Sequence, residues 1–100
     1  MEITISSPHL NLTDQEEQLL RHKVDHLARL YRRIESCDVV VKKIPDDASR
    51  NYFLEGKLRV PRRTLFASDQ AETLDIAIEK LVSDLEHGLR QYKEELEDYR

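Results

Sequence analysis

The sequence predicts an α+β fold, a two-layer β-α-β-β-β-α sandwich in which two helices cover one face of a four-stranded sheet. Two long segments carry apolar residues at helical spacing, and four short segments are β-branched or alternate between apolar and polar residues. A sheet with one apolar face needs a cover, which two helices with one apolar stripe each can supply. The 100 residues are therefore expected to form a single domain spanning 1–100.

The first strand and the first helix are marked by local signals at the N-terminal end. Residues 2–6 alternate polar side chains with isoleucine, which predicts a short strand. A helix is expected to begin next, because Thr13 or Asp14 can accept hydrogen bonds from the unpaired N–H groups of its first turn. Glu16 and Glu17 suit the positive end of the helix dipole.

One apolar stripe defines the extent expected for this helix. Steps of four, three, four and three residues join the members of the stripe, which is flanked by Leu19 and Leu30. The stripe consists of Leu20, Val24, Leu27, Tyr31 and Ile34. The pattern predicts a helix that continues to about residue 34 and packs through this stripe.

Three more strands and a second helix are expected to follow. Residues 37–44 are β-branched and predict a strand, residues 45–51 have loop composition, and 52–60 alternate as in a sheet buried on one side. A short hairpin connection leads to a returning strand over 64–68. The second helix is expected from about Thr73. Its stripe is Leu74, Ile78, Leu81, Leu85, Leu89, Tyr92 and Leu96.

The composition fits a small domain of a reducing cytoplasm. Hydrophobic residues make up 39% and charged residues 36%, and no run of about 18 apolar residues could cross a membrane. The first ten residues lack the basic flank and apolar run of a secretory signal. Cys37 is the only cysteine, so no intrachain disulfide is possible, and its place in a β-branched run predicts burial.

Charge is unevenly distributed along the chain, although the net charge is −4. Residues 69–100 carry ten acidic and four basic side chains, whereas residues 14–68 carry twelve basic and nine acidic ones. On a helical projection, four cationic or potentially cationic side chains fall opposite the apolar stripe of the first helix. They are His22, His26, Arg29 and Arg33, with Lys23 at the shoulder and Arg21 and Arg32 on the other flank.

Two interpretations of this cationic row remain open. An exposed helix face must be polar, and Lys and Arg are good helix formers, so the row is consistent with an ordinary solvated face. Against this, Asp25 is the only acid nearby on the helix, and the strands add further cations. These are Lys42, Lys43, Lys57, Arg59, Arg62 and Arg63. Cations clustered on one side of a small α+β domain are typical of phosphate-backbone binding.

No pattern in the sequence predicts a metal, cofactor or catalytic site. His22 and His26 have a spacing of four that suits a shared metal, but the stretch lacks the glutamate of a zincin helix and a third ligand. Surface histidines are the simpler interpretation. There is no glycine-rich phosphate loop and no nucleophile motif, so we expect neither an enzyme nor a small-molecule substrate.

Three segments in order carry a family resemblance: "RHKVDHLARLYRRI" leading into "CDVVVKK", the hairpin "LRVPRRTLFAS", and the closing "TLDIAIEKLVSDLEHGLRQYKEEL". Together they resemble the ribosome hibernation-promoting factor family, also called the ribosome-associated inhibitor or sigma-factor modulation family. The resemblance implies a short-form member that binds the small ribosomal subunit and its rRNA where mRNA and tRNA meet. Such a factor blocks translation in stressed or stationary cells, and its fold is close to a double-stranded-RNA-binding domain.

The resemblance also implies which side chains bind rRNA. Members of the family usually have basic residues on the first helix at the positions of Lys23, His26, Arg29 and sometimes Arg33. On the second helix, Arg90 and Lys93 are the nearest cations to the basic positions of the family. The RNA-binding residues expected from this reasoning are Lys23, His26, Arg29, Arg33, Lys42, Arg90 and Lys93.

The second helix departs from the pattern of the family. Asp84, His87 and Gln91 stand where Lys or Arg is usual, and acidic residues surround Arg90 and Lys93. These acids are Glu86, Glu94, Glu95, Glu97 and Asp98. The alternative function is therefore a protein–protein interaction module of the same fold, which would use its acidic second helix or its open sheet face.

Overall fold

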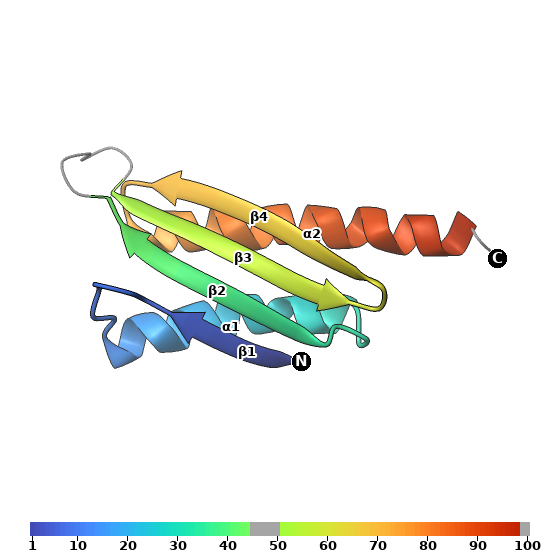
Figure 1. The fold of residues 1–100 in the computed structure, drawn as a ribbon, viewed down its shortest axis with the longest axis horizontal. Helices are drawn as coiled ribbons and strands as arrows, with labels where there is room; N and C mark the ends of the chain where they lie inside the picture. Colours follow the sequence, from blue (N-terminus) through green and yellow to red (C-terminus); the bar gives the residue numbers. More distant parts are fainter. Residues whose placement is uncertain (45–50, 99–100) are drawn as a thin grey trace.

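The computed structural model describes residues 1–44 and 51–98, which form one sheet and two helices (Figure 1). The elements are β1 (Glu2–Ser6), α1 (Asp14–Leu30), β2 (Ser36–Lys43), β3 (Tyr52–Val60), β4 (Arg63–Ala71) and α2 (Leu74–Asp98). The strand order is β1-β2-β3-β4, with β1 parallel to β2 and the other pairs antiparallel. Both helices lie on the same face of the sheet, so the predicted α+β sandwich is confirmed. The loop expected over 45–51 lies outside the described residues, except for Asn51.

Alternation along the strands decides which face of the sheet the helices cover. Val39 and Val41 of β2 and Leu54 and Leu58 of β3 are buried beneath the helices, whereas their sequence neighbours point to the open face. At Gly56 a Cβ would come within 3.1 Å of Leu85 Cδ1 and 3.3 Å of Leu81 Cδ1. The absence of a side chain at this position lets α2 pack directly against the backbone of β3.

α1 begins where the sequence predicts and ends earlier. The Thr13 hydroxyl accepts a hydrogen bond from the Glu16 N–H, and the Glu16 carboxylate accepts one from the Thr13 N–H, so Thr13 is the N-cap in a capping box. At the other end, Tyr31 is extended, with φ −156° and ψ 115°, which ends the helix at Leu30. The expected continuation to about residue 34 is therefore wrong. Ile34 is still buried, but it reaches the core from the turn before β2.

α2 follows its predicted stripe until it passes the end of the sheet. The six stripe residues from Leu74 to Tyr92 are buried, and Ala77 joins them. Leu96 is 38% exposed, so its expected place in the core is wrong. Figure 1 shows the reason: the last turns of α2 extend beyond the ends of the strands, so the described part of the sheet does not lie against them.

A tyrosine junction joins the end of α1, the β3–β4 hairpin and α2. The Tyr92 hydroxyl donates a 2.9 Å hydrogen bond to the Pro61 carbonyl in the hairpin turn. The Tyr31 ring packs edge-on against the Tyr92 ring with centroids 5.7 Å apart, and the Arg63 guanidinium lies 5.4 Å from the Tyr92 centroid. These contacts fix the hairpin turn relative to both helices.

Cys37 is fully buried on β2 between Ile3 of β1 and Leu58 of β3. Burial, followed by the nearby Asp38 carboxylate, raises the pKa of its thiol to about 12. The thiol is therefore neutral at physiological pH, and the burial expected for Cys37 is confirmed.

Candidate functional site

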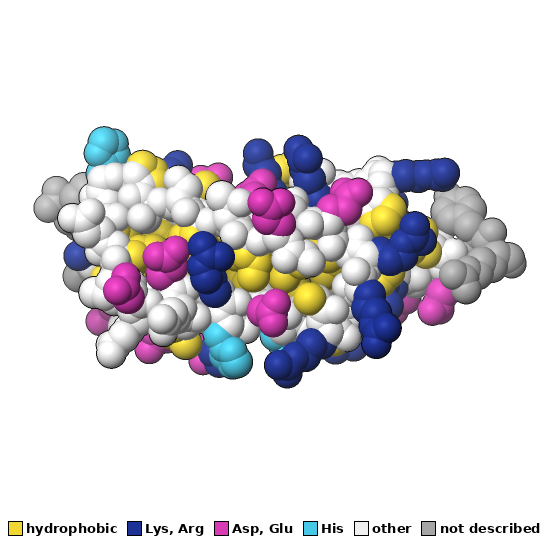
Figure 2. Space-filling view, turned by 90° about the horizontal axis from the view of Figure 1, so that it is seen from below, with side chains coloured by type: hydrophobic (Ala, Val, Ile, Leu, Met, Phe, Trp, Pro, Cys, Tyr) yellow, Lys and Arg dark blue, Asp and Glu magenta, His cyan; other side chains and the backbone are white. Residues whose placement is uncertain are grey.

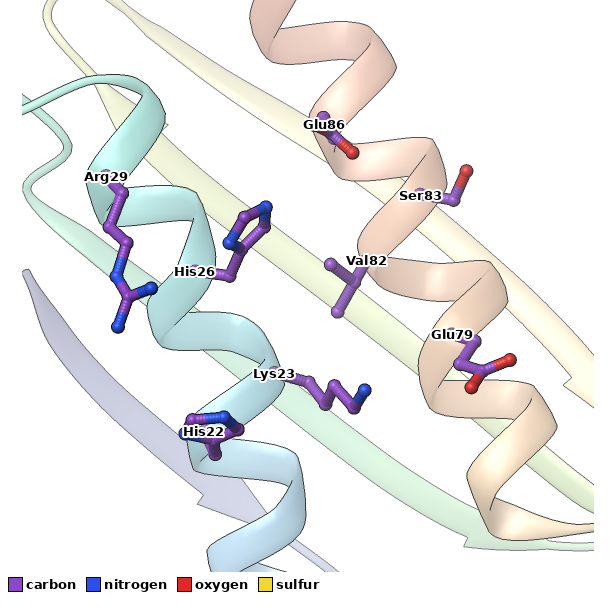
Figure 3. Close-up of a pocket in the computed structure, with 8 residues that line it drawn as sticks. All are labelled: His22, Lys23, His26, Arg29, Glu79, Val82, Ser83 and Glu86. Carbon is purple, nitrogen blue, oxygen red and sulfur yellow. The ribbon is translucent and has the colours of Figure 1, made fainter.

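A groove of about 360 Å³ runs between α1 and α2 on the outer side of the helical layer (Figure 3). One wall comes from α1 and the other from α2. The lining residues are His22, Lys23, His26, Arg29, Glu79, Val82, Ser83 and Glu86. Figure 3 shows Lys23 and His26 extending from α1 toward α2, with Val82 on the opposite wall. Val82 is the one apolar side chain among the lining residues, and the others are polar or charged.

The cationic wall follows from the way α1 is seated on the sheet. Leu20, Val24 and Leu27 face the core, which turns His22, His26 and Arg29 outward, and of these His26 extends toward α2 (Figure 3). Lys23, placed on the shoulder by the sequence, occupies the flank that borders the groove. On the opposite flank, Arg21 donates a 3.1 Å hydrogen bond to the Ile3 carbonyl of β1. The members of the row on α1, His22, His26 and Arg29, therefore border a groove rather than open solvent alone.

The opposite wall is acidic, which the sequence pattern of α1 could not show. Glu79 and Glu86 of α2 line the groove across from Lys23, His26 and Arg29. The Arg90 guanidinium, one turn further along α2, forms a 3.0 Å ion pair with the Glu86 carboxylate. Acids that are scarce beside the row on α1 are therefore supplied across the groove by α2.

The remaining residues predicted to bind RNA lie in different places. Because α1 ends at Leu30, Arg33 leaves the helical row and lies in the turn before β2, which corrects its predicted position. The Lys93 ammonium donates a 2.9 Å hydrogen bond to the Leu30 carbonyl and so caps α1. Lys42 pairs with Glu55 at 3.2 Å on the open sheet face, on the other side of the sheet from the groove. The structure thus brings Lys23, His26 and Arg29 together and separates Lys42 from them.

Asp84 belongs to the flank of α2 that faces β4 rather than to the groove. Burial, followed by a hydrogen bond to Asp84 and the charge of that carboxylate, raises the pKa of Asp69 on β4 to about 6, and the Lys80 ammonium acts in the opposite direction. One carboxylate oxygen of Asp69 is buried and has no hydrogen-bond partner among the described residues. His87 and Gln91 lie within hydrogen-bond distance of each other, at 3.3 Å.

A second cluster of cations, which we call the arginine end, was not predicted as a separate site, although Arg33 was expected to bind RNA. It gathers side chains from the turn before β2 and from the β3–β4 hairpin with the strand ends beside it. Its members are Arg32, Arg33, Arg59, Arg62 and Arg63. The Glu35 N–H donates a 2.8 Å hydrogen bond to the Arg59 carbonyl, which holds the two chain segments together. Figure 2 shows Lys and Arg side chains gathering toward the end of the molecule that carries the C-terminus.

The open sheet face carries a shallow hollow of about 500 Å³ between two phenylalanines. Phe53 and Phe66 line it, and Phe66 is 71% exposed. The Lys42 and Lys57 ammonium groups lie 6.0 and 5.9 Å from the centroids of Phe53 and Phe66. Asp38 and Glu55 also line the hollow, so its charges are mixed rather than predominantly basic.

Within residues 1–44 and 51–98, no group of three His, Cys, Asp or Glu side chains could hold a metal ion. In the same ranges, neither helix is long and apolar enough to span a bilayer. Lys23, His26 and Arg29 are exposed and border an open groove. This arrangement is suited to binding an extended, charged surface.

Comparisons with known proteins agree on one family and one fold. A family model described as sigma 54 modulation protein / S30EA ribosomal protein matches residues 3–97. A curated relative from Acinetobacter guillouiae, named ribosome hibernation promoting factor, is 27% identical over 106 aligned positions, which cover 100% of this chain and 94% of the relative.

Two solved structures share the fold at low sequence identity. A ribosomal subunit interface protein from Coxiella burnetii superposes with a TM-score of 0.81 at 15% identity, covering 93% of this chain and 98% of that one. The N-terminal domain of Protein Y from Thermus thermophilus gives a TM-score of 0.79 at 21% identity, covering 92% and 99% of the two chains. Both likenesses confirm the order and packing of the six elements.

Proposed function

Because the chain belongs to the sigma 54 modulation protein / S30EA ribosomal protein family, we propose that it is a ribosome-associated factor that binds the small ribosomal subunit. It would contact rRNA phosphates in the channel where mRNA and tRNA meet and inhibit translation in stressed or stationary cells. In this proposal residues 1–100 act as a single ribosome-binding domain in the cytoplasm, with no catalytic step.

The observation that carries the proposal is the cationic wall of the groove. Lys23, His26 and Arg29 lie on one flank of α1 and are exposed, so their charges are available to an anionic partner. RNA phosphates are such a partner, because Lys and Arg side chains neutralise backbone phosphates and release their counterions. The acids of α2 oppose this attraction, so we expect α1 to contribute more to binding than α2.

The decisive experiment is co-sedimentation of the purified protein with small ribosomal subunits over a series of salt concentrations. Binding through phosphates should weaken steeply as salt rises, because counterions released from RNA make association salt-dependent. The double substitution Lys23→Gln with Arg29→Gln should lower the affinity by roughly tenfold or more and reduce the slope of log affinity against log salt.

A matched control removes the same number of charges elsewhere on the protein. Arg21→Gln with Lys80→Gln replaces two cations whose side chains donate to the carbonyls of Ile3 and Gln70, and it should bind nearly as well as the wild type. Thermal unfolding of each variant checks that the fold is intact. Binding that ignores both salt and the Lys23 and Arg29 substitutions would contradict the proposal and favour the protein–protein alternative.

A further inference from the structure

The arginine end is the feature of the molecule that the groove does not include. The chain has ten arginines, and five of them lie here, two in the turn before β2 and three between the end of β3 and the start of β4. Arg63 is neutralised by a 2.6 Å ion pair with Glu95. The side chains of Arg32, Arg33, Arg59 and Arg62 are exposed, and none of them makes an ion pair with a described residue.

The hairpin turn presents one of these arginines from an unfavourable backbone conformation. Val60 and Arg63 are the last paired residues of β3 and β4, so Pro61 and Arg62 form the turn. Arg62 has φ 68°, in the left-handed region where a Cβ is disfavoured and glycine or asparagine is usual. The backbone alone does not favour arginine at this position, which points to a role for its side chain.

The turn is also held rigidly. The Tyr92 hydroxyl donates to the Pro61 carbonyl, and the Arg63 guanidinium packs over the Tyr92 ring. A hollow of about 360 Å³ next to the turn is lined by Arg59, Arg62 and Arg63, with Glu35 as the one acidic side chain among its lining residues. Because the backbone of the turn is already fixed, only the arginine side chains lose conformational freedom when they bind, which favours specific contacts.

We propose that the arginine end is a second phosphate-binding site, in which Arg59 and Arg62 grip the RNA backbone separately from the groove between the helices. Guanidinium groups suit this ligand, because their planar fork can donate two parallel hydrogen bonds to one phosphate. The site rests on the proposed ribosome binding and adds to it. It would supply, from the hairpin and the adjoining turn, basic contacts that α2 does not provide.

The test compares small-subunit binding of the wild type with that of Arg59→Gln combined with Arg62→Gln. We expect the double variant to lose about tenfold in affinity and to reduce the slope of log affinity against log salt by between about 1 and 2, as for the loss of two phosphate contacts. The Arg21→Gln with Lys80→Gln pair is the charge-matched control and should retain both affinity and slope.

The single substitution Arg62→Gly separates a binding effect from misfolding. Glycine adopts a positive φ without a steric penalty, so this variant should unfold at the same or a higher temperature than the wild type while binding small subunits more weakly. Affinity and salt slope equal to those of the wild type in both arginine variants would overturn the inference. If the wild type itself did not bind small subunits, the proposed function would fail first.

Discussion

α1 and α2 pack on the same sheet through the same kind of apolar stripe, yet their exposed sides carry opposite charge. The flank of α1 that borders the groove carries Lys23, His26 and Arg29, whereas the facing flank of α2 carries Glu79 and Glu86. α1 ends at Leu30, whose carbonyl accepts a hydrogen bond from the Lys93 ammonium. α2 continues beyond the ends of the strands into an acidic segment. The helices are therefore equivalent as structural elements and different as surfaces.

This difference shows that the core and the surface of such a domain are set by separate sets of residues. The stripes fix where each helix lies, and the positions that remain exposed can change sign without moving the backbone. In α2, Asp84 is turned toward Asp69 of β4 rather than into the groove. The net charge of −4 consequently says little about whether an anionic partner can bind.

The largest expected effect would test whether the helices are equivalent in the core. Leu27 of α1 and Leu85 of α2 are both buried, so Leu27→Ala and Leu85→Ala should each lower the free energy of unfolding by about 2–5 kcal/mol. Leu96→Ala, at the exposed end of α2, should change it by less than about 0.5 kcal/mol. Chemical denaturation measures all three, and a small loss at either core site would break the equivalence.

The next effect concerns the charged walls. Glu79→Gln combined with Glu86→Gln removes the acidic wall and frees Arg90 from its ion pair, so affinity for small subunits should rise by roughly threefold to tenfold. The gain should shrink at high salt, because screening weakens the repulsion that has been removed. An unchanged affinity would show that bound RNA does not approach α2.

The smallest effect tests the carboxyl pair on the far flank of α2. The pKa of Asp69 is raised to about 6 in the folded state from an ordinary value of 3.8. The folded protein therefore binds more protons between these values, and the stability contributed by this group falls as pH rises from about 4 to about 6. Asp69→Asn should raise the free energy of unfolding at pH 7.5 by about 1 kcal/mol. This is less than the roughly 3 kcal/mol that two pKa units represent, because the exposed Asp84 carboxylate is screened by solvent.

The pH dependence provides the check on this prediction. Thermal unfolding between pH 4 and pH 7.5 should show a smaller decline for Asp69→Asn than for the wild type. Asp25→Asn, which removes an exposed carboxylate on α1, is the matched control and should retain the decline of the wild type. Parallel curves for the wild type and Asp69→Asn would contradict the assignment of the decline to this pair.

The fold was predictable because its signals are local. Apolar periodicity located both helices, alternating or β-branched runs located the four strands, and the capping residues marked the start of α1. The sequence did not predict where α1 ends, because its apolar pattern continues through Ile34 while the backbone turns at Tyr31. That ending depends on the Tyr31–Tyr92 packing and on the Lys93 cap, which are contacts between residues about 60 positions apart.

Only the α1 wall of the groove was predictable from the sequence. Helical spacing placed His26 and Arg29 opposite the apolar stripe of α1 with Lys23 at its shoulder, because helical geometry alone relates these residues. The acidic wall depends on how α2 lies beside α1, and the arginine end depends on the register that sets Ser36 opposite Arg59. Neither relation can be read from the chain before its elements are packed.

The burial of Cys37 gives the protein an intrinsic probe of its own opening. Its thiol is enclosed on the central strand β2 and is neutral at physiological pH, so a thiol-specific reagent can modify it only when the sheet separates. The labelling rate divided by that of the unfolded chain then measures the fraction of molecules that are open. Repeating the measurement with bound small subunits would show how far binding suppresses opening, without any engineered label.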